Sequence, residues 1–317
     1  MMLKKKVLLI SNPKLKKYYK KIITTYGSKL ENIDENYSIF KKKIPEFTAV
    51  VSLPSYFVKA EIFNLAKQLD WIQFGYAGVE NVLIPELINS NIVVTNGKIV
   101  QGPPIADQAM ALCLSLIRRI KPAILEKKII YRPIELKNKK VLIYGLGGIG
   151  MLIAERIKTF GCYVIGIDKE LKPLNSFIDE CYRPDKLIQN LQKSDIVFVS
   201  SPLTSETEGI FGKKEFNKMK KESYIINVAR GKIIDTNSLV KALNSKEISG
   251  AGLDVTDPEP LNSSHILRKL DNVIVTPHNA GFSDMNRDRS ISIMKENVKR
   301  YFQNNSLLNE VNKLKGY

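Results

Sequence analysis

The sequence predicts an α/β protein built from two Rossmann-like domains, each with a parallel sheet. Short apolar runs that suit buried strands alternate with longer runs that suit helices, which is the pattern of parallel sheets with crossover helices. The alternation covers about the first 100 residues, is interrupted by one long helical run, and then resumes. A chain of 317 residues is too long for one typical domain and comfortable for two.

The first series of elements supplies the smaller domain. Its predicted strands are Val7–Ile10, Ala49–Leu53, Trp71–Phe74 and Ile92–Thr95. Helices are predicted over Leu15–Tyr26 and Ala60–Leu69. A long helix then follows from Ile105 to about Arg119, opened by Pro103-Pro104, because proline is tolerated in a first turn.

The second series supplies the larger domain. Its predicted strands are Lys140–Tyr144, Tyr163–Asp168, Asp195–Ser200, Ser223–Asn227, Gly250–Asp254 and Asn272–Thr276. The predicted helices are Ile149–Phe160, Lys186–Gln192, Lys213–Lys218, Thr236–Asn244 and, near the end, Arg287–Tyr301. The pattern alone does not say on which domain the last helix packs.

The composition favours an intracellular protein without a metal site. Cys113, Cys162 and Cys181 lie far apart with no CxxC spacing, which argues against a disulfide framework or a zinc site and fits a reducing compartment. The apolar run Val7–Ile10 is shorter than the roughly 7–15 residues of a signal-peptide core. Residues 105–117 contain Asp107 and fall short of the roughly 20 residues of a membrane span. We therefore predict a cytoplasmic protein with no membrane partner.

The formal net charge of +17 is compatible with two partners. A basic face would bind nucleic acid by releasing counterions from phosphates. The lysines, however, are scattered among ordinary core residues, and no recognised nucleic-acid module accompanies them. We expect no nucleic-acid partner, and a positive field that attracts small anionic substrates.

A glycine-rich turn between a predicted strand and a predicted helix is the strongest single motif. Gly145, Gly147 and Gly150 have the GxGxxG spacing. In such a turn the first glycine bends the chain tightly, the second lets a pyrophosphate approach the backbone, and the third lets helix and strand pack closely. The anion then binds free N–H groups at the helix N-terminus. The motif predicts a dinucleotide site.

An acidic residue at the end of the next strand indicates which dinucleotide binds. The carboxylate of Asp168 can accept hydrogen bonds from the adenosine ribose hydroxyls and repels a 2′-phosphate, which favours NAD. Lys169 beside it leaves room for NADP. The alternative is a glycine-rich turn with a structural Asp168.

Three polar residues of the second series suggest acid–base chemistry on an anion. Arg230 lies just past the strand Ser223–Asn227, where ligands bind in open α/β sheets, and its planar guanidinium suits a carboxylate. His278 follows the last strand, and Glu259 would orient its ring and stabilise the imidazolium. Taken alone, Arg230 fits a surface ion pair equally well, and His278 fits a structural role. The other histidine, His265, is predicted to be structural or exposed.

Together these segments resemble the D-isomer-specific 2-hydroxyacid dehydrogenase family, which includes glyoxylate/hydroxypyruvate reductases. The likeness extends over nearly the whole chain, and the motifs occur in the family's order. They are Trp71-Ile72-Gln73, Ala77-Gly78-Val79, Thr95-Asn96-Gly97, the glycine turn with Asp168, Ser201-Pro202-Leu203-Thr204, Asn227–Gly231, Gly252–Asp254, Glu259 and Thr276-Pro277-His278.

The resemblance implies an active site in the cleft between the two domains. Residues 1–98 and 282–317 would form the substrate-binding domain, and residues 99–281 the NAD-binding domain. It also implies an NAD-dependent oxidoreductase that moves a hydride between nicotinamide and C2 of a small D-2-hydroxy or 2-keto acid. The helix over residues 103–119 resembles the family's dimerisation element, which predicts a homodimer.

The family's residue roles carry over onto this sequence. By analogy His278 is the acid/base, Glu259 its partner and Arg230 the substrate anchor. The predicted substrate-binding residues are Ala77, Gly78, Arg230 and His278. The predicted cofactor-binding residues are Gly145, Gly147, Gly148, Ile149, Gly150, Asp168, Ser201, Pro202, Val228 and Asp254. Among these, Asp254 and the Val228 carbonyl would hold the nicotinamide carboxamide.

Two functional hypotheses remain open. Glyoxylate or hydroxypyruvate is the favoured substrate, because the compact chain resembles those reductases. The alternative is a dinucleotide-sensing regulatory or corepressor-type protein with the same fold and little turnover. Tyr76 and Phe282 are candidates for lining the substrate pocket, although packing roles explain them equally well.

Overall fold

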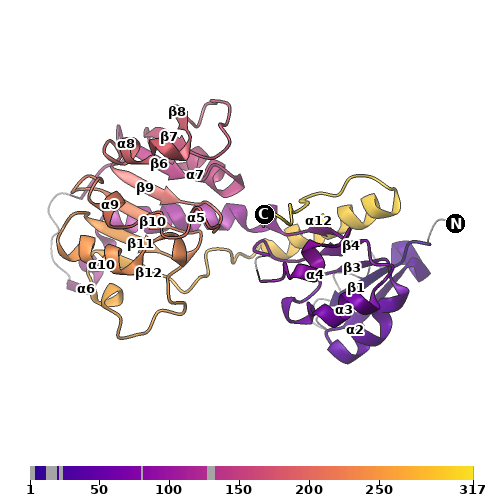
Figure 1. Ribbon diagram of the computed structural model, residues 1–317. Coiled ribbons are helices and arrows are strands. Elements are labelled where there is room, and N and C mark those ends of the chain that lie inside the picture. The colour runs from indigo at the N-terminus through magenta and orange to yellow at the C-terminus, as the bar shows by residue number, and fades with distance from the viewer. Residues whose placement is uncertain (1–3, 12–19, 21–23, 80, 127–132, 317) are drawn as a thin grey trace. The chain divides into compact units, whose positions relative to one another are not determined.

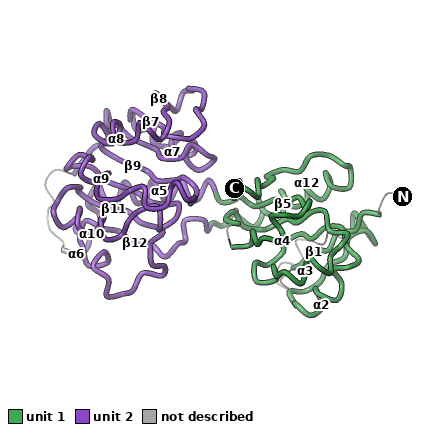
Figure 2. Tube along the Cα trace, in the orientation of Figure 1, with its two compact units in different colours: residues 1–101, 283–317 green, residues 102–282 purple. Residues whose placement is uncertain are grey.

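The computed structural model of the chain divides into two compact units (Figure 2). Unit 1 comprises Met1–Gln101 and Ser283–Tyr317, and unit 2 comprises Gly102–Phe282. The structure describes residues 4–11, 20, 24–79, 81–126 and 133–316. The units divide after residues 101 and 282, whereas the domains predicted from the sequence divide after residues 98 and 281.

Unit 1 contains a five-stranded parallel sheet with the order β2-β1-β3-β4-β5 (Figure 1). Its strands are β1 (Val7–Ser11), β2 (Leu30–Asp34), β3 (Ala49–Val51), β4 (Trp71–Gln73) and β5 (Val93–Thr95). Its α-helices are α2 (Tyr37–Lys43), α3 (Ala60–Leu65), α4 (Pro85–Ile88) and α12 (Asn286–Phe302). This strand order is that of flavodoxin-like doubly wound sheets.

Both faces of the unit 1 sheet are covered, as a parallel sheet requires. Successive residues of β1 point to opposite faces, so Leu8 packs with α2, α3 and α4 while Leu9 packs with α12. Helix α12 contributes Ile291, Met294 and Val298 to that second core. The last helix therefore packs on the unit that is built from the N-terminal residues.

Unit 2 contains a seven-stranded parallel sheet with the order β12-β11-β10-β9-β6-β7-β8. Its strands are β6 (Lys140–Tyr144), β7 (Tyr163–Ile167), β8 (Glu180–Tyr182), β9 (Ile196–Val199), β10 (Tyr224–Asn227), β11 (Gly250–Leu253) and β12 (Val273–Val275). Its helices are α6 (Ile120–Glu126), α7 (Gly148–Lys158), α8 (Leu187–Leu191), α9 (Lys213–Phe216), α10 (Thr236–Asn244), α11 (Ile266–Lys269) and nearly all of α5 (Lys98–Ile117).

The strand order reverses at β6, which pairs with β7 on one side and β9 on the other. Helices α5 and α7 cover one face of the sheet, and α8, α10 and α11 cover the other. The last residues of neighbouring strands are in register: Tyr144 with Val199, Val199 with Asn227, Asn227 with Leu253, and Leu253 with Val275. The segments that follow these strands therefore share one edge of the sheet, which is where ligands bind in doubly wound folds.

Two strands that the sequence prediction missed lie at sheet edges. β2 and β8 are each the outermost strand of a sheet. Both strands contain polar residues that are only partly buried, as at Glu31, Asn32 and Glu180. An edge strand has one open side, so it lacks the continuous apolar run that identifies a central parallel strand.

Three other expectations were wrong or fall outside the described residues. The helix expected to open at Pro103-Pro104 begins at Lys98, whose N–H donates to Oδ1 of Asn96 at 3.3 Å, and both prolines lie inside it. The strand expected over Ala49–Leu53 ends at Val51, because Ser52 adopts a left-handed φ of 62°. The helix predicted over Leu15–Tyr26 lies largely outside the described residues. In the described parts of the chain, every helix is too short or too polar to cross a lipid bilayer.

Candidate active site

The glycine turn lies between β6 and α7, where the strand order reverses. Gly145 has a left-handed φ of 98°, and a Cβ there would lie 2.6 Å from the backbone of Ser201. A Cβ at Gly150 would lie 2.0 Å from the carbonyl oxygen of Gly145. Both positions therefore exclude a side chain, as the motif predicts.

The two middle glycines of the turn are not required by the packing of the chain. Gly147 and Gly148 are exposed, and a Cβ at either would meet no atom within 4 Å. Gly147 caps α7, so the unpaired N–H groups of the first helical turn lie beside this open space. Next to the turn, the hydroxyl of Ser201 is buried without a hydrogen-bond partner in the described structure. Open backbone, helix N-terminus and an unused hydroxyl fit the pyrophosphate of a dinucleotide.

Asp168 is held against the glycine turn. Its Oδ2 accepts a hydrogen bond from the Leu146 N–H at 2.7 Å, and its Oδ1 accepts one from the Glu170 N–H at 3.0 Å. The neighbouring Lys169 forms an ion pair with Glu206, from the segment after β9. The carboxylate thus stands at the end of β7, where the sequence predicts contacts with the ribose.

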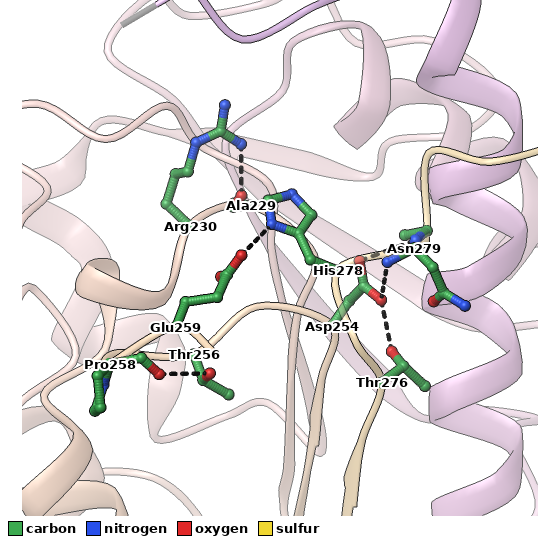
Figure 3. A network of polar contacts seen from close by, with 10 residues as sticks. Ala229, Arg230, Asp254, Thr256, Pro258, Glu259, Thr276, His278 and Asn279 are labelled. Atoms are coloured by element: carbon green, nitrogen blue, oxygen red, sulfur yellow. Dashed lines mark hydrogen bonds and ion pairs between the residues drawn. The ribbon is translucent and has the colours of Figure 1, made fainter. Parts of the chain in front are cut away.

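His278 and Glu259 lie at hydrogen-bond distance from each other, as the predicted acid–base pair requires. Nδ1 of His278 lies 2.5 Å from Oε1 of Glu259 (Figure 3). The two side chains are 47% and 40% exposed, so the pair is open to a substrate. His278 has a left-handed φ of 51°, a conformation that costs energy for a residue with a side chain and that recurs at functional sites.

The buried carboxylate of Asp254, at the end of β11, holds the loop that carries His278. It accepts hydrogen bonds from the hydroxyl of Thr276 at 2.6 Å and from the N–H groups of Asn279 and Ala280 at 3.2 and 3.0 Å (Figure 3). The N–H of His278 in turn donates to the Asp254 carbonyl at 2.9 Å. Hydrogen bonds to an ionised acceptor are strong, so Asp254 fixes the conformation of this loop.

Arg230 lies at the end of β10 on a turn organised by Asn227. The side chain of Asn227 donates to the Arg230 carbonyl at 2.9 Å and accepts from the Ala229 N–H at 3.0 Å. Nη1 of Arg230 donates to the carbonyl of Ala229 at 2.8 Å. A Cβ at Gly231 would lie 2.0 Å from the Thr256 carbonyl oxygen, so this turn packs closely against the segment that leads to Glu259.

These contacts bring Arg230, Glu259 and His278 together at one edge of the unit 2 sheet (Figure 3). A histidine paired with a carboxylate can give a proton to a developing alkoxide, and a guanidinium beside it can bind a carboxylate and polarise a carbonyl. Ala77 and Gly78 lie in unit 1, in the loop after β4. The roles predicted for Pro202, Val228 and the other binding residues remain predictions.

Several residues that support the site were not singled out as functional from the sequence. Asn227 and Thr276 are polar residues at strand ends whose side chains organise the loops that follow. Gln108 on α5 also donates to the Thr276 hydroxyl at 3.3 Å. A polar residue at the carboxyl end of a predicted strand is the sequence signal that points to them. His265, predicted to be structural or exposed, accepts a hydrogen bond from the Leu267 N–H as the cap of α11.

Tyr76 and Phe282 have different surroundings. Tyr76 is partly buried in unit 1, with its ring 5.3 Å from that of Phe74. Phe282, the last residue of unit 2, is 77% exposed. Packing accounts for Tyr76, whereas a pocket-lining role for either residue remains a prediction.

Comparison with known proteins agrees with this geometry. The family model described as "D-isomer specific 2-hydroxyacid dehydrogenase, NAD binding domain" matches residues 110–280. A glyoxylate reductase of Thermofilum pendens is 34% identical over 271 residues, which cover 81% of this chain and 79% of the relative. A D-isomer specific 2-hydroxyacid dehydrogenase family protein from Aeromonas salmonicida matches with a TM-score of 0.83 at 26% identity, covering 98% of this chain and 99% of that one. A family structure from Xanthobacter autotrophicus, in complex with NADPH and MES, matches with a TM-score of 0.82 at 25% identity over 99% of each chain.

Proposed function

The chain belongs to the D-isomer specific 2-hydroxyacid dehydrogenase family, and we propose that it is an NADH-dependent reductase of a small 2-keto acid, glyoxylate or hydroxypyruvate. The observation that carries this proposal is the pair of His278 and Glu259 beside Arg230. That pair lies at the same edge of the unit 2 sheet as the glycine turn, whose exposed backbone fits a dinucleotide. This reduction needs three chemical groups, which are an acid, an anion-binding group and a hydride carrier.

The chemistry assigns one task to each side chain. Bound NADH supplies the hydride that reaches C2 of the keto acid. His278 donates its proton to the C2 oxygen as negative charge develops there, and Glu259 stabilises the imidazolium until that moment. Arg230 binds the substrate carboxylate and polarises the carbonyl, an electrostatic contribution that is arranged before the reaction begins. The backbone N–H groups of Ala77 and Gly78, in unit 1, are the groups of that unit that we expect to bind a substrate carboxylate.

The residues around Asp168 support NADH over NADPH. We expect the Asp168 carboxylate, which accepts a hydrogen bond from the Leu146 N–H, to lie beside the ribose and to repel a 2′-phosphate. The ion pair with Glu206 neutralises Lys169, the nearest cation along the chain. The Xanthobacter structure is a complex with NADPH, so membership of the family does not by itself decide the cofactor.

Glu206→Gln tests this account of cofactor choice. Removing the Glu206 charge leaves Lys169 able to attract a 2′-phosphate, so kcat/KM for NADPH should rise about tenfold relative to that for NADH, which corresponds to roughly 1.4 kcal/mol. Glu208→Gln is the matched control, because Glu208 lies two residues away and pairs with Lys232 instead. An unchanged ratio in Glu206→Gln would remove this ion pair from cofactor selection.

The direct experiment follows NADH absorbance with purified protein. Glyoxylate, hydroxypyruvate, pyruvate, phenylpyruvate and 2-oxoglutarate are each supplied as substrate, and the series is repeated with NADPH. We expect the highest kcat/KM with glyoxylate or hydroxypyruvate and NADH, because the Thermofilum pendens relative is a glyoxylate reductase. NADH binding without turnover of any keto acid would contradict the proposal and favour a dinucleotide-sensing protein.

We also propose that the enzyme is a cytoplasmic homodimer. Helix α5 resembles the family's dimerisation element, and the next helix, α6, exposes the apolar side chains of Ile120, Ile124 and Leu125. A second copy that covers these side chains would remove them from water. All three cysteines are free thiols, which suits a reducing compartment. Sedimentation velocity should give twice the chain mass, and a monomer at micromolar concentration would contradict the dimer.

A further inference from the structure

The motif Thr95-Asn96-Gly97 has no role in the chemistry above, yet it holds the loop that carries Ala77 and Gly78. Nδ2 of Asn96 donates to the Ala77 carbonyl at 2.6 Å, and the N–H of Gly97 donates to the Tyr76 carbonyl at 2.8 Å. Both contacts lie within unit 1. Two consecutive carbonyls of the loop are thus tied to one short segment after β5.

The segment is itself rigidly placed. Asn96 is 2% exposed, and its N–H donates to the Asn309 carbonyl at 3.2 Å. The side chain of Asn309 donates back to the Asn96 carbonyl at 3.3 Å. A Cβ at Gly97 would lie 3.0 Å from the Gly75 carbonyl oxygen, so the two segments are packed as closely as a glycine permits.

These anchors decide where the next two N–H groups point. A trans peptide is planar, so its N–H points away from the carbonyl of the preceding residue. With the Tyr76 and Ala77 carbonyls turned toward residues 96 and 97, the N–H groups of Ala77 and Gly78 turn to the opposite side. Among the residues that the structure describes, neither N–H donates to an acceptor, and both residues are partly exposed.

Adjacent backbone N–H groups that point to the same side and have no protein acceptor can bind an anion. We propose that Asn96 is a positioning residue, which aims the N–H groups of Ala77 and Gly78 at the substrate carboxylate by holding the Ala77 carbonyl. This inference rests on the proposed function, in which that loop binds a 2-keto acid. Asn96 touches neither substrate nor cofactor in this account and acts only through the loop.

A purely structural role for Asn96 predicts a different pattern of variants. Its Oδ1 also accepts from the Lys98 N–H at 3.3 Å and so caps α5. Asn96→Ser keeps a good capping oxygen, because serine is a preferred cap, but its hydroxyl is too short to reach the Ala77 carbonyl. Asn96→Ala loses both interactions. The serine variant therefore distinguishes the effect of holding the Ala77 loop from the effect of capping α5.

The test measures steady-state kinetics with glyoxylate at saturating NADH, together with inhibition by oxamate, a carboxylate that is not reduced. We expect Asn96→Ser and Asn96→Ala both to raise the KM for glyoxylate and the inhibition constant of oxamate about tenfold or more, the scale of one hydrogen bond to a charged group. The Kd of NADH should stay unchanged and kcat should fall less than KM rises. Asn36→Ala is the matched control: it removes a capping asparagine oxygen from α2 in the same unit, away from the Ala77 loop, and KM should be that of the wild type.

Two kinetic results would overturn the proposal. The first is a wild-type KM and oxamate inhibition in Asn96→Ser. The second is a defect in Asn96→Ala that serine restores, which would make Asn96 a helix cap only.

A binding readout keeps the inference separate from the proposed reaction. In a titration of the NADH complex with oxamate, the ¹⁵N–¹H resonances of Ala77 and Gly78 should shift in the wild type, and much less in Asn96→Ser. These shifts in a protein that reduces no keto acid would contradict the proposed reaction and support the carboxylate site. Their absence in the wild type would overturn the carboxylate site.

Discussion

Gly147 offers a direct test of the dinucleotide site, because nothing within the chain requires it to be glycine. Its backbone is extended, with φ −72° and ψ −167°, and a Cβ would meet no atom within 4 Å. Replacing glycine by alanine at such a position stabilises a protein by about 0.4–1 kcal/mol, because the unfolded chain loses freedom. For Gly147→Ala without cofactor we therefore expect a Tm that is unchanged or raised by up to about 4 °C.

The same methyl group should weaken cofactor binding. It would occupy the open space into which the pyrophosphate is proposed to fit, and overfilling a packed contact costs about 1–3 kcal/mol. The Kd for NADH should therefore rise roughly 5- to 150-fold. Titration of NADH fluorescence gives the Kd, and thermal unfolding of the free protein gives the Tm.

Gly150→Ala is the matched control within the same turn. Its Cβ would lie 2.0 Å from the Gly145 carbonyl oxygen, so the turn has to rearrange and the Tm of the free protein should fall. Comparison of the two variants therefore distinguishes a glycine that leaves room for a ligand from a glycine that the packing of the chain requires. Wild-type affinity for NADH in Gly147→Ala would refute the placement of the pyrophosphate beside Gly147. A clearly lower Tm of that variant would refute the statement that a Cβ at Gly147 meets no atom of the chain.

Three further changes test the acid–base pair, its loop and the fold. His278→Gln should lower kcat by about 10²–10⁴-fold and leave the Kd of NADH unchanged, and normal turnover would remove His278 from the chemistry. Asp254→Asn places an NH₂ group among the N–H donors of the His278 loop, so kcat should fall roughly 10²-fold, whereas wild-type kcat would show that the loop needs no such anchor. Asp179→Asn tests the acid stability of the fold: burial raises the pKa of Asp179, but hydrogen bonds from Lys158 and the Val164 N–H outweigh it, and the net pKa is lowered. Its contribution to stability is therefore present above about pH 4 and is lost as the pH falls. The Tm of Asp179→Asn should be below that of the wild type at pH 7, the difference should shrink as the pH falls below about 4, and equal Tm values at pH 7 would contradict this account.

Most of the central strands were predictable because their signal is local. A strand buried on both faces, such as β6 or β9, is a continuous apolar run bounded by polar residues, and that pattern needs no knowledge of its neighbours. The edge strands β2 and β8 escaped prediction because their partly exposed residues carry no such run. The start of α5 was wrong for a related reason: prolines in the sequence suggested a beginning, while the cap is the side chain of Asn96.

The sequence predicted the glycine turn from local spacing and the pairing of His278 with Glu259 from residue types, but it did not predict the contacts that hold these segments. The GxGxxG spacing specifies a turn by itself, because each glycine has a steric reason within a few residues, and Gly145 and Gly150 have those reasons in the structure. The contacts of Asp168 with Leu146 and of Asn96 with Ala77 join residues about twenty positions apart. No local pattern contains such a contact.

The amino-acid sequence by itself determined the α/β class, the dinucleotide turn and the residue types available for acid–base chemistry. Only the tertiary structure decided that Asp254 turns its carboxylate to the loop that carries His278, and it placed the predicted partners His278 and Glu259 at hydrogen-bond distance. The physical reason is the register of the parallel sheet. Because strands far apart in the sequence end at the same edge, the segments after them come within hydrogen-bond distance, and that alignment is set by packing over the whole sheet.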